Sequence, residues 1–293
     1  MELHSRLRAL GVWQFTDGMS LPQAEEFVGR LEQLGYSALW LPDTVGRDPF
    51  AHIAHLAGGT TTLVFATGIA SIFHRHPGAM QQVANTLDEQ TGGRFVLGLG
   101  VSHAPMVAGL RKLDYSLPLS QMRAYLTAMD IAPYSASPPA QTPTRLLAAL
   151  GPKMIELARD AADGAHPYWT TPEHTAQARE ILGPDKLLCV EQKVVWSTDP
   201  SVAREFGAQA VGAYADLPNY RNNWKRLGFT DDEIDRREPR FIDAVVAWGD
   251  ADAIRARLQA HSDAGATHVC IQPLSAERGQ VDWSCLEALA PAS

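Results

Sequence analysis

Short apolar runs alternate along the chain with segments in which apolar residues recur every three or four positions. A continuous apolar run predicts a buried strand, whereas the longer spacing predicts a helix that buries one face. We therefore expect strands over residues 11–13, 36–41, 61–72, 95–99, 145–150, 163–166, 187–196 and 268–272. Helices are expected between them, starting near residues 20, 77, 119, 152, 172, 199 and 250, with a closing helix over 285–290.

Residues that start and stop helices stand where this alternation requires them. Ser20 followed by Pro22 and Gln23 is typical of a helix start, because serine and glutamine three residues apart can satisfy free backbone N–H groups there. Gly35 is placed to end the same helix. Local signals thus support the alternation that the periodicity predicts.

The order of these elements predicts the fold class. Almost every expected strand is followed by a helix, which implies a parallel sheet with right-handed crossovers. Eight such units in 293 residues favour an α/β fold, a (β/α)8 TIM barrel, as a single domain over residues 1–293. Two stretches interrupt the rhythm: residues 132–144, rich in Pro, Ser and Ala, predict a loop, and the polar residues 214–240 predict an insertion before the last units.

Composition narrows the class of partner. The formal net charge of −8 argues against nucleic acid and anionic membrane, because both attract basic surfaces. No apolar stretch approaches the roughly 20 residues of a membrane span, and the start lacks the apolar core of a secretory signal. The cysteines Cys189, Cys270 and Cys285 lack metal-type spacing, so we expect buried thiols and a reducing, cytoplasmic location.

Candidate site residues follow the expected strands, because a barrel of this kind carries its active site at the carboxyl ends of its strands. They are Asp43, Thr44, Gly68, Ile69, Gly100, Ser102, His103, Gly151, Pro152, Lys153, Met154 and Glu191. Asp43 is equally well explained as a helix cap, and His103 as a solvated loop residue. Glu191 lies inside an apolar strand, where a buried carboxylate needs a partner or a ligand, which favours a site role.

One segment offers an anion site. Gly151-Pro152-Lys153 follows a strand and opens a helix, so free backbone N–H groups and a lysine come together there. Proline also favours an ordinary helix start, and both interpretations stay open.

Three familiar sequence motifs are incomplete or absent. Gly98 and Gly100 suggest a dinucleotide fingerprint, but His103 stands where the next glycine is needed. His74 and His76 have no companion acid, so no metal site is expected. A hydrolase triad has no anchor, because no Gly-x-Ser-x-Gly elbow is present.

Several pieces, in their order and spacing, resemble the luciferase-like flavin and deazaflavin oxidoreductases, and in particular a subgroup of F420-dependent enzymes. They extend over nearly the whole chain: Ala66-Thr67-Gly68-Ile69, Arg75-His76-Pro77, Thr86-Leu87-Asp88, residues 92–105, residues 148–154, residues 163–168, residues 171–175 and residues 264–269. The resemblance implies a luciferase-like barrel with coenzyme F420 as cofactor and FMN as the alternative. Relatives are often dimers, so a homodimer is expected.

The resemblance also assigns roles to the candidate residues. It implies a cis peptide at Gly68–Ile69 behind the deazaflavin ring, Asp43 at the ring edge, and the coenzyme phosphate along residues 151–154. It places residues 100–103 beside the ring. One branch of the family has a proton-transfer histidine where this chain has Thr44 and a glutamate where it has His103, so His103 becomes the candidate acid or base and Thr44 a relay.

These expectations combine into a function. A hydride is expected to pass between C5 of the deazaflavin and a small organic substrate at the barrel mouth, because the cofactor carries the chemistry and the barrel orients it. Trp13 and Trp169 are candidate walls of the substrate pocket, although core packing explains each equally well. The alternatives are an FMN-dependent monooxygenase and a barrel that binds the cofactor without turnover.

Overall fold

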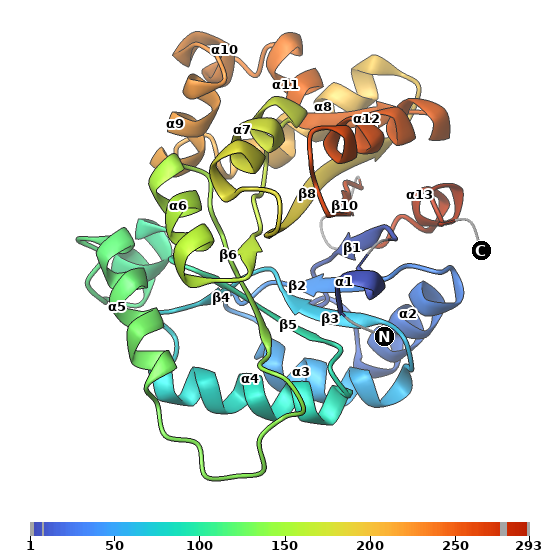
Figure 1. Cartoon of the computed structure of the whole chain (residues 1–293). Helices are drawn as coiled ribbons and strands as arrows, with labels where there is room; N and C mark the ends of the chain where they lie inside the picture. The colour runs from blue at the N-terminus through green and yellow to red at the C-terminus, as the bar shows by residue number, and fades with distance from the viewer. Residues whose placement is uncertain (1–2, 8, 276–279, 292–293) are drawn as a thin grey trace.

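A computed structural model describes residues 3–7, 9–275 and 280–291 and contains the expected closed barrel (Figure 1). Within these residues, eight parallel strands form the ring: β1 (Gly11–Trp13), β2 (Ala38–Leu41), β3 (Val64–Thr67), β5 (Phe95–Gly100), β6 (Thr144–Leu147), β7 (Gly164–Ala165), β8 (Leu187–Trp196) and β10 (His268–Pro273). β10 closes the ring because it pairs with β1 on one side and with β8 on the other. The fold class predicted from the sequence is confirmed.

Helices surround the strands and cover the outside of the barrel (Figure 1). They are α2 (Leu21–Gln33), α3 (Pro49–Leu56), α4 (Pro77–Thr91), α5 (Pro118–Asp130), α6 (Pro152–Ala161), α7 (Pro172–Leu182), α8 (Pro200–Gly212), α12 (Ala251–Asp263) and α13 (Trp283–Ala288), with a 3-10 helix at Ala57–Gly59 and a π-helix at Pro105–Leu110. The short α1 (Leu3–Arg6) instead packs with the side chains of the barrel interior, through Leu3. The predicted start of α2 is present, with the Ser20 backbone N–H donating to the Gln23 side chain at 2.8 Å. Asp48, Thr171 and Asp250 cap α3, α7 and α12 with their side-chain oxygens.

The third strand differs from its expected extent over residues 61–72. It is divided into β3 and a two-residue strand, β4 (Ala70–Ser71), and the peptide bond Gly68–Ile69 between them is cis. β3 pairs with the start of β5, at Phe95 and Val96, whereas β4 pairs with its end, at Leu99 and Gly100. The cis peptide lies where the family resemblance places it, and the division explains why the strand is shorter than its apolar run.

The expected insertion over residues 214–240 is not simply a polar loop. It folds into α9 (Pro218–Arg226), α10 (Asp231–Asp235) and α11 (Pro239–Val245), which lead into an extra strand, β9 (Val246–Gly249), beside the carboxyl end of β8. These helices are short and richly charged, so their few apolar positions gave no clear period in the sequence. The strand β9 was missed because it is four residues long and directly follows a helix.

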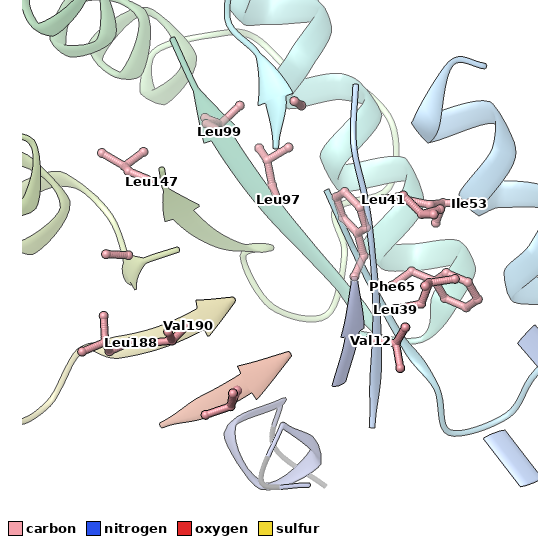
Figure 2. Packing of buried hydrophobic residues seen from close by; sticks show 14 of the residues in the cluster. Val12, Leu39, Leu41, Ile53, Phe65, Leu97, Leu99, Leu147, Leu188 and Val190 are labelled. Atoms are coloured by element: carbon pink, nitrogen blue, oxygen red, sulfur yellow. The ribbon is translucent and has the colours of Figure 1, made fainter. Parts of the chain in front are cut away.

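Two apolar regions hold the helices to the barrel. Figure 2 shows the larger one, in which side chains of the strands pack outward against the helices, among them Val12, Leu39, Phe65, Leu97 and Leu188. A second cluster lies under the insertion and joins it to α8 and β8; its buried members include Trp169, Val195, Tyr220, Trp224, Phe241 and Ile242. The insertion therefore has an apolar core of its own, although its exposed face is polar.

The barrel interior is filled by side chains. Trp40 stacks on His166 with ring centroids 4.2 Å apart and donates its indole N–H to Nε2 of His268 at 3.1 Å. Cys189 and Cys270 are buried beside them, and burial raises the pKa of the Cys189 thiol to about 12. The interior is thus a packed floor beneath the mouth.

The second cluster predicts how much the insertion depends on its buried indole. Replacing Trp224 with alanine removes a fully buried ring that contacts Phe241 and donates to the Trp169 carbonyl at 3.0 Å. We expect the W224A variant to lose about 3–5 kcal/mol of unfolding free energy in urea titrations. The neighbouring half-exposed Lys225, changed to alanine, should cost less than about 1 kcal/mol. Equal losses for the two variants would contradict a core role for the insertion.

Candidate functional site

The carboxyl ends of all eight barrel strands open on one mouth, which has two halves. The ends of β2, β3, β5 and β6 form the first half, and those of β7, β8, β10 and β1 form the second. All but one of the site residues predicted from the sequence follow strands of the first half. Glu191, inside β8, belongs to the second half.

Asp43 follows β2 and is held as a carboxylate. One of its oxygens, Oδ2, accepts hydrogen bonds from Nδ1 of His74 at 2.9 Å, from the Ser71 backbone N–H at 3.2 Å and from the Arg75 guanidinium at 3.3 Å. Burial alone would raise the pKa of Asp43, but the hydrogen bond and charge of His74, with those of Ser71 and Arg75, hold the pKa below its usual value. Asp43 is therefore not a helix cap; it joins the ends of β2 and β4.

Glycines allow neighbouring side chains to approach the backbone closely at the ends of β3 and β5. The Trp13 indole N–H donates to the Gly68 carbonyl at 2.9 Å, and a Cβ at Gly68 would stand only 2.5 Å from the same nitrogen. On the other side, a Cβ at Gly100 would meet the Ile69 side chain at 2.3 Å. The backbone at Gly68–Ile69 is thus enclosed by Trp13 and by β5, and larger residues at either glycine would displace it.

His103 follows β5 on a turn in which Ser102 adopts a positive φ of 54°. Its ring lies 5.5 Å from that of Tyr220 in the insertion, and its Nδ1 is buried without a hydrogen-bond partner among the described residues. Burial lowers the pKa of His103, and a hydrogen bond with Asn219 opposes this only in part. The histidine is therefore a half-buried neutral imidazole, not a freely solvated loop residue.

Thr44 lies near this loop through its backbone. Its carbonyl oxygen accepts a hydrogen bond from Arg111 at 2.9 Å, which ties the segment after β2 to the segment after β5. Its expected role as a proton relay stays a prediction.

The start of α6 combines several donors. Gly151 precedes the helix, Pro152 opens it and Lys153 is exposed on its first turn. The guanidinium of Arg226, on α9, stands 3.6 Å from the position that a Cβ at Gly151 would take. Arg226 also donates to Oδ1 of the buried Asn223, whose amide nitrogen has no hydrogen-bond partner among the described residues. The Arg226 guanidinium thus lies at a helix start, which is a combination that suits an anion, and Lys153 is a second cation on the first turn of that helix.

The second half of the mouth holds a buried ion pair that the sequence analysis missed. The Lys193 ammonium donates to Oε1 of Glu191 at 2.6 Å and to Oε1 of Gln272 at 2.6 Å, and it lies 3.5 Å from the centroid of the Tyr168 ring. Burial raises the pKa of Glu191 and lowers that of Lys193 to about 8, while each charge opposes the shift of the other.

The structure thus gives Glu191 a protein partner. Its second oxygen accepts from the Trp169 backbone N–H at 3.2 Å, and its side chain is fully buried. A signal for the pair was present in the sequence, because Glu191 and Lys193 lie two positions apart and so share one face of the strand. The expected contact of Glu191 with a cofactor stays a prediction.

Aromatic rings separate the two halves. Trp13 and Tyr168 lie 5.3 Å apart, and Tyr168 contacts Tyr214 and Tyr220 from the insertion at 5.7 and 6.3 Å. We call Trp13, Tyr168, Tyr214 and Tyr220 the aromatic row. Beyond it the second half contains a cavity of about 250 Å³, to which Trp169 contributes, as expected from the sequence.

A model of the luciferase-like monooxygenase family matches residues 5–268, which is most of the chain. The chain belongs to the luciferase-like monooxygenase family. One relative is a Mycobacterium tuberculosis protein, named provisionally as a coenzyme F420-dependent oxidoreductase. It is 26% identical, and the match covers 92% of this chain and 95% of that protein. A 5,10-methylenetetrahydromethanopterin reductase of Methanolobus tindarius is 24% identical over 83% of this chain and 80% of its own.

Two solved structures, one of an F420-dependent dehydrogenase and one of an FMN-bound monooxygenase, have the same fold. An F420-dependent secondary alcohol dehydrogenase in complex with an F420–acetone adduct superposes with a TM-score of 0.76 at 14% identity, covering 99% of this chain and 97% of its own. The FMN-bound oxygenating constituent of 3,6-diketocamphane monooxygenase from Pseudomonas putida gives 0.68 at 15% identity, with 97% of each chain covered. The luciferase-like barrel recognised in the sequence is confirmed.

Two features are absent from the residues that the structure describes. No group of three or more His, Cys, Asp or Glu side chains among them could hold a metal ion. None of the helices they form is long and apolar enough to cross a membrane.

The buried pair predicts a specific pattern of stability. Lys193→Met leaves the Glu191 carboxylate buried without its cation, so we expect a loss of about 3–5 kcal/mol of unfolding free energy at pH 7. The double variant E191Q/K193M removes both charges and should recover a large part of that loss. Urea titrations of the wild type, K193M and the double variant measure both effects. A double variant no more stable than K193M would show that the unpaired carboxylate is not what destabilises K193M.

Proposed function

We propose that this protein is an F420-dependent oxidoreductase that transfers a hydride between C5 of the deazaflavin and a small organic substrate. When bound, the deazaflavin supplies a carbon that accepts or donates a hydride, whereas the barrel supplies orientation and electrostatics. Support comes from the family, from relatives named as F420-dependent enzymes, and from the first half of the mouth.

The first half of the mouth has groups suited to each part of such a coenzyme. Gly68, Ile69 and Gly100 would lie against its ring: the two glycines present no side chain there, and the apolar Ile69 side chain packs over Gly100. Asp43 would lie at the ring edge, where its Oδ1 has no hydrogen bond from a described residue, and Ser102 and His103 would lie beside the ring.

The start of α6 is the observation that carries the proposal. Residues 151–154 would hold the phosphate of the coenzyme at the helix start, where the Gly151 and Lys153 backbone N–H groups are the donors, because Pro152 has no N–H and the Met154 N–H donates to the Gly151 carbonyl at 3.1 Å; Lys153 and Arg226 would supply positive charge. The buried, unpartnered amide of Asn223 is explained if an anion accepts its hydrogen bond.

FMN is the second candidate cofactor, because it also carries a phosphate and because an FMN complex is among the similar structures. The exposure of Pro152 and Lys153 favours F420, whose phosphate continues into an anionic tail that must leave the protein. A barrel that bound F420 without turnover would bind the coenzyme as tightly as an oxidoreductase does, but it would oxidise or reduce no substrate.

His103 is our candidate for proton transfer, with Thr44 as its relay partner. A neutral, half-buried imidazole with one nitrogen unpartnered can accept a proton from a reacting group. Because burial lowers its pKa, the neutral form that accepts a proton is present at pH 7.

The anion site is tested by binding. We expect Arg226→Gln to weaken F420 binding about tenfold, because a charge-assisted hydrogen bond contributes about 1.5 kcal/mol or more. The 5-deazaflavin riboside, which lacks the phosphate and the tail, should bind the wild type and R226Q equally. Coenzyme fluorescence measures both affinities, and FMN titrated in the same way separates the two cofactors.

Arg240→Gln is the matched control for this measurement, since Arg240 lies on the same insertion but its side chain is exposed and paired with Glu233. It should leave F420 binding unchanged. Wild-type protein that bound neither F420 nor FMN would overturn the proposed function.

The proton-transfer assignment predicts a separation of binding from turnover. His103→Gln keeps a polar side chain of similar size but has no titratable group, so kcat should fall about 10²-fold or more while F420 affinity stays within about threefold. Stopped-flow oxidation of reduced F420, with a substrate found by screening, measures kcat. Coenzyme fluorescence measures the affinity for F420. Unchanged kcat in H103Q would move the proton-transfer role to another group.

A further inference from the structure

The cavity in the second half of the mouth has a lining of unusual composition. Its walls combine aromatic rings with four glutamines, Gln14, Gln209, Gln272 and Gln280, and among the described lining residues only Lys193 can carry a charge. Amide groups and rings suit an uncharged occupant, because an ion would lose its hydration without gaining an opposite charge.

Hydrogen bonds determine how Gln272 faces this cavity. The side-chain atom 2.6 Å from the Lys193 ammonium must be the amide oxygen, because an ammonium only donates. The Tyr168 hydroxyl donates to the same oxygen at 2.9 Å. Two protein donors therefore occupy the oxygen of Gln272. Its amide nitrogen makes no hydrogen bond with a described residue and can donate to a molecule in the cavity.

The charge of Lys193 is compensated within the protein. Its partner Glu191 lies 2.6 Å away and both side chains are buried, so the pair has no net charge whether the shared proton lies on nitrogen or on oxygen. Lys193 therefore does not attract an anion into the cavity; instead it positions the amide of Gln272.

The cavity adjoins the proposed coenzyme site across the aromatic row. Tyr168 lines the cavity and contacts Trp13, and Trp13 in turn donates to the Gly68 carbonyl at 2.9 Å. An occupant of the cavity would thus lie at the boundary between the two halves of the mouth.

We propose that this cavity binds an uncharged organic molecule that has a hydrophobic ring and a carbonyl or hydroxyl oxygen. The oxygen accepts a hydrogen bond from the Gln272 amide, and the ring packs against Phe15, Trp169 and Phe206. That this molecule is the substrate rests on the proposed redox function, whereas its binding does not.

The test uses the full-length protein without coenzyme and three probes of similar size. Acetophenone has a ring and a neutral acceptor oxygen, benzoate replaces the acceptor with an anion, and ethylbenzene has no acceptor. We expect acetophenone to bind about tenfold more tightly than benzoate and several-fold more tightly than ethylbenzene, because the apolar probe leaves the amide donor unpaired. Ligand-observed NMR titrations measure the three affinities, and benzoate binding as tightly as acetophenone would overturn the proposal.

Two glutamine variants test the donor itself. Gln272→Glu keeps acceptor oxygens for Lys193 and Tyr168 but removes the N–H donor, so acetophenone should bind at least about tenfold more weakly. Gln209→Glu introduces the same change on an exposed part of the same lining, and acetophenone affinity should stay within about threefold. Equal losses in the two variants would show that added charge, and not the lost donor, is responsible.

A third variant locates the site and separates this inference from the proposed function. Ala213→Phe places a ring at the exposed rim of the cavity and should abolish acetophenone binding while leaving F420 affinity unchanged. If acetophenone binds as expected but neither F420 nor FMN binds, the redox function fails and the cavity assignment stands. If F420 binds and A213F binds acetophenone like the wild type, the cavity assignment fails alone.

Discussion

The rest of the structure depends on the closure of the parallel barrel by β10, which pairs with β1 on one side and β8 on the other. Closure places every strand's carboxyl end at one mouth, so residues that are far apart in sequence become neighbours. It also encloses an interior that Trp40, His166 and His268 fill, which gives the mouth a solid floor. A ligand at this mouth therefore binds above a packed core and not in a pore.

The insertion completes the mouth from outside the ring of strands. Helix α9 brings Tyr220 against His103 and Arg226 against the start of α6, whereas Trp224 anchors the helix in an apolar cluster with Phe241. One short helix thus contributes to the first half of the mouth with groups that the barrel strands do not supply. This explains why a polar surface segment has fully buried aromatic side chains on its inner face.

The Lys193–Glu191 pair organises the second half. Burying two charges is costly, and it is tolerated here because each has further partners: Gln272 and the Tyr168 ring for the ammonium, and the Trp169 backbone N–H for the carboxylate. The same contacts orient Gln272 and join β7, β8 and β10 near the cavity. Two ionised residues in the barrel thereby produce a lining without net charge.

The sequence by itself determined the strand–helix alternation, the helix starts at Ser20 and Asp250, and the candidate residues after each strand, because these signals depend on neighbours a few positions away. It did not reveal the helices of the insertion, whose few apolar residues are buried only by contact with the barrel. Only the tertiary structure decided the partners of Asp43, Glu191 and Gln272, and the approach of Arg226 to Gly151. Most of these partners are tens of residues apart, and the pairing of neighbouring strands and the packing of the insertion on the barrel bring them together.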